Sequence, residues 1–226
     1  MKNISIALDG PAGAGKSTLA KRTAEHFGFI YVDTGALYRC IGLYAFRNDV
    51  ASANKTGVIK LLAEIELEMK YDETGMQRMI LCGEDVTEAI RMPEISKYAS
   101  DVSAIPEVRD FLLSMQRDMA LKYNVIMDGR DIGTVVLPNA DLKIFITADT
   151  DERAKRRYLE LSAKNVETTL DEVKYAMIDR DTNDSMRETA PLKPADDAVI
   201  LDTTNLDFNE SFQAICEMVV TVLRKP

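Results

Sequence analysis

Residues 10–17 read Gly10-Pro11-Ala12-Gly13-Ala14-Gly15-Lys16-Ser17 and match the pattern G-x-x-x-x-G-K-[S/T]. They follow a short apolar run, from Ile4 to Leu8, and precede a helix-like segment from about Gly15 to Phe27. A glycine-rich turn between a strand and a helix directs successive backbone N–H groups at a phosphate, and the positive N-terminal end of the helix strengthens the attraction. The stretch therefore predicts a P-loop, which binds a nucleoside triphosphate.

Individual positions of this P-loop have distinct expected roles. Lys16 would reach the β- and γ-phosphates, and the Ser17 hydroxyl would ligate Mg²⁺. The alternative is a glycine-rich turn that carries a surface lysine. We expect the nucleotide-binding residues to be Gly10, Pro11, Ala12, Gly13, Ala14, Gly15, Lys16, Ser17 and Thr18.

Further short apolar runs predict additional strands of the same sheet. They lie at residues 29–32, 125–127, 142–147 and 198–201, with helical patterns between or after them. Strands of three to six apolar residues that alternate with helices indicate a parallel sheet covered on both faces. The predicted fold class is therefore α/β, with the three layers of a P-loop NTPase and a parallel central sheet.

Two segments depart from this alternation. Residues 65–82 alternate apolar and polar residues around the turn-forming sequence Asp72-Glu73-Thr74-Gly75, which predicts an antiparallel hairpin. Residues 151–193 are dense in charge, with arginines on both sides of a break from Lys164 to Thr169. We interpret this second segment as a mobile helical flap.

The composition indicates a folded and acidic protein. Of the 226 residues, 46% are hydrophobic and 29% are charged, and the formal net charge is −9. A protein that works mainly on nucleic-acid phosphates would normally be basic, so the charge disfavours a nucleic-acid partner. Because no stretch of about 18 apolar residues and no signal-peptide pattern occurs, we expect no membrane partner and a cytoplasmic location.

Two further motifs follow predicted strands. The segment from Asp33 to Arg39 would place Arg39 on a second helix, near the sheet edge where ligands bind in open α/β folds. The strand at 125–127 is followed by Asp128, which could hold a metal ion through its waters. A helix cap or a turn remains the alternative role for Asp128.

Taken together, these motifs resemble bacterial cytidylate kinases over essentially the whole chain. The segments that carry the resemblance occur in the family's order and are the P-loop, Asp33-Thr34-Gly35-Ala36-Leu37-Tyr38-Arg39, Asp128-Gly129-Arg130-Asp131-Ile132-Gly133-Thr134-Val135-Val136 and Arg187-Glu188-Thr189-Ala190-Pro191-Leu192. The resemblance implies transfer of the γ-phosphoryl group of ATP, with Mg²⁺, to CMP or dCMP. It also implies one kinase domain, 1–226, with a core at about 1–35, 124–150 and 194–226, a monophosphate-binding insert at about 36–123 and a lid at about 151–193.

The resemblance assigns the contacts with the acceptor nucleotide. Arg39 and Arg130 would grip the acceptor phosphate, with assistance from Arg187. The cytosine edge offers an N4 amine that suits a carboxylate, and N3 and O2 acceptors that suit an arginine or a hydroxyl. The residues that would read it are Ser100, Arg109 and Asp131.

The remaining assignments concern the lid and the catalytic groups. Arg180 and Asp184 would hold the ribose or the phosphate, and Thr34 keeps the hydroxyl of the serine found in many members. The metal would be held by Ser17 and Asp128. The catalytic residues would be Lys16, Arg130, Arg187 and Arg157, and the arginines that would close over ATP are Arg153, Arg156 and Arg157.

Other interpretations remain open beside the resemblance. A P-loop kinase for a different acceptor, such as UMP, AMP or a small metabolite, would share most of these motifs. A GTPase-type switch would need an N-K-x-D element, and the nearest string, Asn54-Lys55-Thr56-Gly57, lacks the aspartate. Arg153, Arg156 and Arg157 could instead form a solvated helix face that pairs with Asp151 and Glu152. We expect the protein to act as a monomer.

Overall fold

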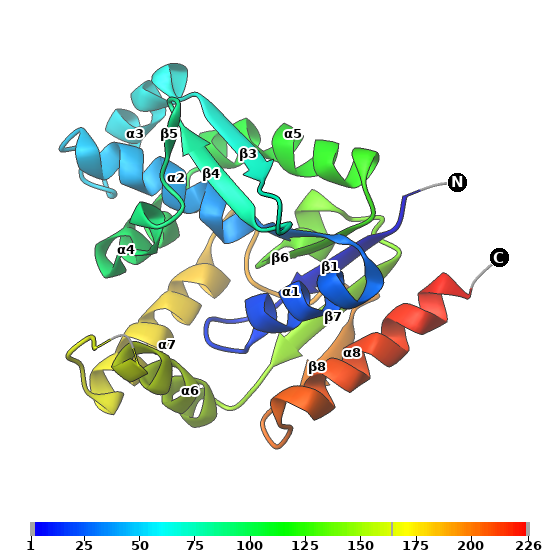
Figure 1. The fold of residues 1–226 in the computed structure, drawn as a ribbon. Helices are drawn as coiled ribbons and strands as arrows, with labels where there is room; N and C mark the ends of the chain where they lie inside the picture. Colours follow the sequence, from blue (N-terminus) through cyan, green and yellow to red (C-terminus); the bar gives the residue numbers. More distant parts are fainter. Residues whose placement is uncertain (1–2, 164, 225–226) are drawn as a thin grey trace. The chain divides into compact units, whose positions relative to one another are not determined.

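The computed structural model describes residues 3–163 and 165–224 (Figure 1). The chain divides into two compact units. The first unit comprises Met1–Tyr31 and Tyr123–Pro226, and the second unit comprises Val32–Lys122. Each unit has its own cluster of buried apolar side chains, so each is described separately.

A five-stranded sheet forms the centre of the first unit. Its strands, in the spatial order β2-β6-β1-β7-β8, are β2 (Ile30–Asp33), β6 (Val125–Gly129), β1 (Ser5–Asp9), β7 (Leu142–Thr147) and β8 (Val199–Asp202). β1 pairs in parallel with both β6 and β7, and β7 pairs in parallel with β8. The predicted strands are confirmed to within two residues at each end, and the α/β class with a parallel central sheet is confirmed.

The central position of β1 follows from its sequence. Ile6, Ala7 and Leu8 are fully buried, as expected for a strand that is covered on both faces and therefore lacks an apolar–polar alternation. Helices α1 (Lys16–Phe27) and α8 (Phe208–Leu223) pack against the sheet and against each other. Their buried residues, Leu19, Ile215 and Val219, belong to the same core cluster as β1.

The strand order places the P-loop at the edge of the sheet where ligands bind in this class of fold. β6 lies on one side of β1 and β7 on the other, so the order of the strands reverses at β1. In open α/β sheets the ligand crevice lies outside the carboxyl ends of the strands at such a point. Asp9, which ends β1, is in register with Gly129, which ends β6, so the loops after both strands leave from one edge.

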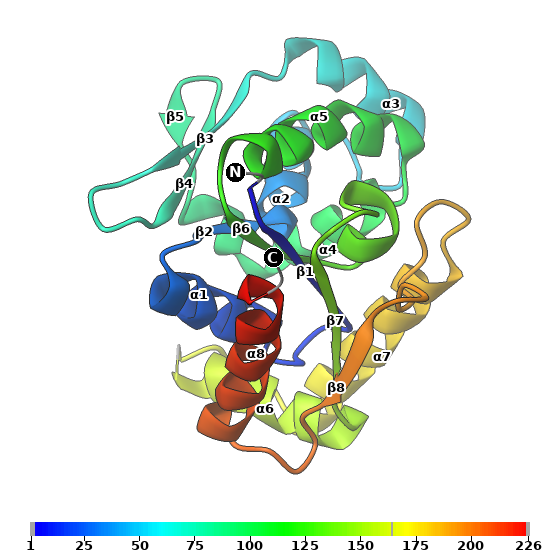
Figure 2. The ribbon, with the colours of Figure 1, turned by 90° about the vertical axis from the view of Figure 1, so that its right-hand side faces the viewer.

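The charged segment from 151 to 193 contains two helices that pack on each other, as Figure 2 shows. They are α6 (Thr150–Ala163) and α7 (Leu170–Met186), and their contact buries Ala154, Val173 and Met177. α7 begins at a capping box in which Thr169 and Glu172 satisfy each other's backbone N–H groups. The prediction of helices is confirmed; Lys164, in the predicted break, lies outside the described residues.

The second unit combines helices with a small antiparallel sheet. Its elements are α2 (Thr34–Arg47), α3 (Lys55–Leu61), a 3₁₀ turn at Leu62–Glu64, β3 (Leu67–Tyr71), β4 (Gln77–Leu81), β5 (Glu84–Asp85), a 3₁₀ turn at Ala89–Arg91, α4 (Pro93–Val102) and α5 (Pro106–Lys122). The predicted hairpin is confirmed, since β3 and β4 pair in antiparallel fashion. In its turn, the Asp72 carboxylate accepts the N–H groups of Thr74 and Met76, each at 3.0 Å.

The chain leaves the first unit within β2, after Tyr31, and returns to it at Tyr123, before β6. At this crossing the Ile30 N–H donates to the Asn124 carbonyl oxygen at 2.8 Å, so the two connections run next to each other. Among the described residues, no helix combines the length and the apolar character that a membrane crossing requires.

Candidate active site

The glycines of the P-loop have backbone conformations that other residues rarely adopt. Gly10 has a φ of 146°, and a Cβ atom there would lie 2.0 Å from the Ile146 carbonyl oxygen. Gly15 has a φ of 81° and precedes α1 without a side-chain cap for the first turn of the helix. The N–H groups of that turn lack the partner that a capping side chain would give, which is the usual arrangement for binding an anion.

Lys16, the first residue of α1, is folded into the P-loop. The residue is 5% exposed, and its Nζ atom donates to the Pro11 carbonyl oxygen at 2.7 Å. Burial lowers the pKa of Lys16 well below its usual value, the Arg130 and Arg180 cations lower it further, and the Asp128 carboxylate opposes the shift. A polyphosphate placed here would favour the charged form of the lysine.

The two residues predicted to hold the metal are in direct contact. Ser17 Oγ donates to Asp128 Oδ2 at 2.6 Å, and the hydroxyl of Tyr31 donates to Asp128 Oδ1 at 3.0 Å. Asp128 lies within β6 rather than at a helix start or a turn, which disfavours its alternative role. A hydroxyl and a carboxylate are the oxygen donors that Mg²⁺ prefers, so this pair fits the metal. Sequence reasoning missed Tyr31, whose only signal was its place on a neighbouring strand.

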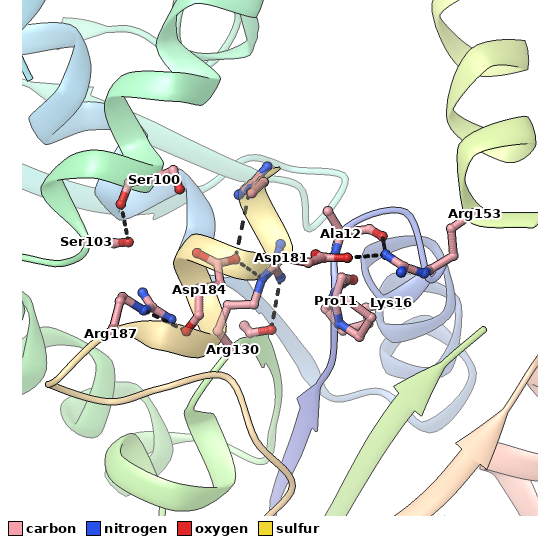
Figure 3. A network of polar contacts seen from close by, with 12 residues as sticks. Pro11, Ala12, Lys16, Ser100, Ser103, Arg130, Arg153, Asp181, Asp184 and Arg187 are labelled. Carbon is pink, nitrogen blue, oxygen red and sulfur yellow. Dashed lines mark hydrogen bonds and ion pairs between the residues drawn. The ribbon is translucent and has the colours of Figure 1, made fainter. Parts of the chain in front are cut away.

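Three arginines of the first unit surround one buried carboxylate, Asp184 on α7 (Figure 3). Arg130 Nε donates to Asp184 Oδ2 at 2.8 Å, and Arg180 Nε lies 3.9 Å from the same oxygen. Arg187 Nε donates to the Asp184 carbonyl oxygen at 3.2 Å. Burial acts to raise the pKa of Asp184, but the three guanidinium groups outweigh it and hold that pKa below its ordinary value. The structure thus brings together four of the predicted substrate-binding residues.

Asp131 lies at the start of a short π-helix, Ile132–Val136. The residue is 4% exposed, and its carbonyl oxygen accepts the N–H groups of Val135 and Val136 at 2.9 and 3.2 Å. The loop after β6 therefore carries Arg130 and Asp131 in a locally ordered backbone.

Arg153 on α6 is fixed to the P-loop. Its Nε atom donates to the Ala148 carbonyl oxygen and its Nη1 atom donates to the Ala12 carbonyl oxygen, both at 2.9 Å. Nη1 also contacts the Asp181 carboxylate, which in turn accepts the Ala12 N–H at 3.1 Å (Figure 3). Sequence reasoning missed Asp181, because nothing in the chain marks it as the partner of Arg153.

Arg156 and Arg157 have different surroundings from Arg153. Arg156 donates to the Glu152 carboxylate at 3.0 Å and to the Thr203 carbonyl oxygen at 2.7 Å. Arg157 pairs with Glu160 at 2.9 Å and its side chain is 39% exposed. In this structure the three arginines do not converge. The alternative interpretation holds for Arg156, which pairs with Glu152, but Arg157 pairs with Glu160, and Arg153 is buried rather than solvated.

The second unit holds the remaining predicted residues on helices. Thr34 is buried at the start of α2, where the Asp33 carboxylate accepts the Ala36 N–H at 3.0 Å and caps the helix. Arg39, on the same helix, donates to the Ile90 carbonyl oxygen at 3.1 Å and to the Ser96 hydroxyl at 3.0 Å. These contacts tie α2 to the 3₁₀ turn at Ala89–Arg91 and to α4 itself.

Ser100 and Arg109 are linked through Ser103. The Ser103 hydroxyl donates to the Ser100 carbonyl oxygen at 2.7 Å, and Arg109 Nη1 donates to the Ser103 carbonyl oxygen at 3.1 Å. Arg109 is 7% exposed, and its guanidinium lies 5.5 Å from the centre of the Tyr38 ring. Two of the residues predicted to read the base are therefore held by one short connection between α4 and α5.

Comparison with known proteins gives consistent matches along the chain. The family model described as cytidylate kinase matches residues 6–225. The cytidylate kinase of Caldicellulosiruptor bescii is 49% identical to this chain, in an alignment that covers 99% of this chain and 99% of the relative. The cytidylate kinase of Caldicellulosiruptor saccharolyticus is 50% identical, over 99% of this chain and 98% of the relative. A solved structure of an uncharacterized protein from Eubacterium ventriosum is similar in fold alone, with a TM-score of 0.53 and 15% identity over 97% of this chain and 99% of that one.

Proposed function

This chain belongs to the cytidylate kinase family, and we propose that it transfers the γ-phosphoryl group of ATP to CMP or dCMP, giving ADP and CDP or dCDP. The observation that carries the proposal is the family match over residues 6–225, which includes every element of the site described above. The geometry of the first unit supports it, since a P-loop, a buried lysine and a cluster of arginines suit a polyanionic substrate.

Phosphoryl transfer asks the protein mainly to position two polyanions and to offset the charge that spreads over the moving group. We propose that the P-loop backbone and Lys16 bind the phosphates of ATP, and that Arg130 and Arg187 stabilise the transferred group. Ser17, with Asp128 beside it, would hold Mg²⁺, which supplies further neutralisation of phosphate charge when it is bound. In a site with little water, each of these cations acts more strongly than it would in bulk solvent.

The acceptor base is proposed to be read by hydrogen bonds. Asp131 would accept from the N4 amine of cytosine, and Ser100 and Arg109 would donate to its N3 and O2 atoms. Uracil presents O4 and a protonated N3 instead, so it would leave Asp131 and Arg109 without matching partners. A site built in this way rejects the wrong base because its own polar groups would be left unpaired.

Further assignments accompany this function. We propose that residues 36–123 form the monophosphate-binding insert and that residues 151–193 act as a lid that limits access of water to the γ-phosphate. Thr34, Arg39, Arg180 and Asp184 would contact the acceptor nucleotide. The catalytic contribution of Arg157 would require it to exchange its partner Glu160 for a phosphate. The enzyme is proposed to be a cytoplasmic monomer that uses only small-molecule partners.

The decisive experiment is ADP release from MgATP with CMP, dCMP, UMP, AMP, GMP or no acceptor. Turnover with CMP and dCMP far above the other acceptors is expected. Lys16→Ala and Arg187→Ala should each lower kcat more than about tenfold without unfolding the protein, because each removes a cation from the transferred phosphate. The matched control is Lys21→Ala, which removes a partly exposed lysine from α1 and should leave kcat unchanged. Equally slow release of ADP with every acceptor and without one would instead indicate an ATPase or a GTPase-type switch.

The base-reading assignment has its own test. Asp131→Ala removes a hydrogen bond to a charged group, a contact that contributes about 1.5–3 kcal/mol. The ratio of kcat/KM for CMP over UMP should therefore fall about tenfold or more, while KM for ATP changes little. An unchanged ratio would remove Asp131 from base recognition.

A further inference from the structure

Asp9 is a buried carboxylate that the proposed chemistry does not use. It is the last residue of β1, directly before the P-loop, and it is 4% exposed. Its Oδ1 atom accepts the Ile132 N–H at 2.8 Å, and its Oδ2 atom accepts the Gly133 N–H at 2.7 Å. Both carboxylate oxygens are thus directed at the loop that follows β6.

These two hydrogen bonds act on the residues next to Arg130 and Asp131. Ile132 and Gly133 open the short π-helix, and Asp131 precedes it directly. A single carboxylate that binds two successive N–H groups fixes both the position and the direction of the backbone at that point, because charge-assisted bonds are short and strongly oriented. Asp9 thus holds the backbone that directly follows Asp131.

The approach at Gly133 is close. A Cβ atom added there would lie 3.3 Å from Asp9 Oδ2 and 3.1 Å from Lys143 Cδ. The absence of a side chain at this position therefore allows the carboxylate to reach the N–H group. Asp9 supplies the carboxylate and Gly133 leaves room for it, so a substitution at either residue would displace the backbone that follows Asp131.

Burial makes the charged form of the Asp9 carboxyl less stable than it would be in water. Burial raises the pKa of Asp9 to about 6, and the neighbouring Asp131 carboxylate raises it as well, while the N–H groups of Gly133 and Ile132 and the Lys16 cation lower it. At neutral pH the group is ionised and able to accept both bonds. Asparagine has nearly the same shape but only one acceptor oxygen, so it would leave one of the two N–H groups facing an amide NH₂.

We propose that Asp9 is a positioning residue for base recognition: through the N–H groups of Ile132 and Gly133 it holds Asp131 in the orientation that accepts the N4 amine of cytosine. Asp9 does not touch the substrate in this account. The inference rests on the proposed function, and in particular on the role of Asp131. It assigns part of the discrimination between cytosine and uracil to a residue on a different strand.

The test is the Asp9→Asn variant of the full chain, assayed with CMP and with UMP. Loss of orientation at a hydrogen-bonding group is expected to lower the CMP-to-UMP ratio of kcat/KM about tenfold, with KM for CMP raised more than KM for ATP. The matched control is Asp141→Asn. The Asp141 carboxylate accepts the Ser5 N–H at 2.9 Å at the other end of β1, so this variant should lose stability and keep the ratio.

A second variant covers the case in which Asp9→Asn does not fold. Gly133→Ala keeps the carboxylate but forces it and Lys143 away from the backbone by a few tenths of an ångström, so it should lower the same ratio. A ratio equal to that of the wild type in the folded variants, or equal losses with both acceptors, would overturn the inference. If the wild type prefers CMP and Asp131→Ala relaxes that preference, such a result rejects only the role of Asp9 and leaves the role of Asp131 standing. A wild type with no preference for CMP would overturn the proposed function itself.

Discussion

Replacement of Asp184 by asparagine tests the electrostatics of the arginine cluster. The Asp184 side chain is 4% exposed and that of Arg130 is 18% exposed, so their ion pair is largely withdrawn from water. Removal of one partner from a buried pair costs about 3–5 kcal/mol. Asparagine keeps one acceptor oxygen, and Arg130 also donates to the Gly129 carbonyl oxygen, so we expect about 2–3 kcal/mol for Asp184→Asn.

The assay is thermal unfolding of the wild type and of Asp184→Asn. A protein of this size loses about 2–4 °C of Tm per kcal/mol, so the variant should melt about 4–12 °C lower at neutral pH. Because the folded-state pKa of Asp184 lies below its ordinary value of 3.8, its contribution is present above about pH 4 and is lost as the pH falls through the lowered pKa. The difference in Tm should therefore be constant near neutrality and should narrow in acid.

Inorganic phosphate provides a second measurement on the same pair of proteins. An added anion can replace the lost carboxylate charge beside Arg130, Arg180 and Arg187, so phosphate should raise the Tm of Asp184→Asn more than that of the wild type. The control is Glu84→Gln, which breaks the exposed pair with Arg47 and should change Tm little. Equal Tm values for the wild type and Asp184→Asn, with equal responses to phosphate, would refute this account of the cluster.

Two other predictions concern β1 and the loop after it. Gly10→Ala should lose at least about 3 kcal/mol of stability or fail to fold, because the new Cβ atom would meet the Ile146 carbonyl oxygen. The control is Gly28→Ala, which should cost only about 1–2 kcal/mol, because Gly28 has a φ of 67° and a Cβ atom there would have nothing within 4 Å. Similar Tm values for the two variants would contradict the steric argument. The pKa of Asp9 rises from 3.8 to about 6 on folding, so its stabilising contribution is present below about pH 4 and is lost as the pH rises through about 6. In urea unfolding, the free energy of unfolding of the wild type should therefore fall by about 3 kcal/mol relative to that of Asp9→Asn between pH 4 and pH 7. Parallel pH profiles of the two proteins would contradict this prediction.

The sequence predicted the parts of the fold that depend on local pattern. The position of the P-loop between β1 and α1 could be predicted because glycine content and apolar runs are patterns of a few neighbouring residues. The proximity of Asp128 to Ser17 could be predicted because the carboxyl ends of parallel strands share an edge. The hairpin at 65–82 was likewise readable from its alternation and its turn.

Contacts between distant positions could not be read in the same way. Arg130 and Asp184 are held together only because α7 packs where it does, and Arg153 reaches Asp181 through the same packing. Neither partner is marked by spacing along the chain. Tyr31 is a similar case, since its hydroxyl meets Asp128 only through the pairing of their strands. The separate core of the second unit is also a tertiary property, because apolar periodicity shows which face of α2 is buried but not against what.

The hydrogen bond between Ile30 and Asn124 bears on how the chain can vary over evolution. It joins the two points at which the second unit is connected to the first, so the whole of Val32–Lys122 begins and ends at neighbouring positions on the sheet. A segment with adjacent ends can be lengthened, shortened or exchanged for another at small conformational cost, since loop closure depends only weakly on the length of the segment. The sheet and its P-loop could thus be inherited unchanged while this segment is replaced. Under the proposal that the segment is the monophosphate-binding insert, such a replacement would be one route to a different acceptor.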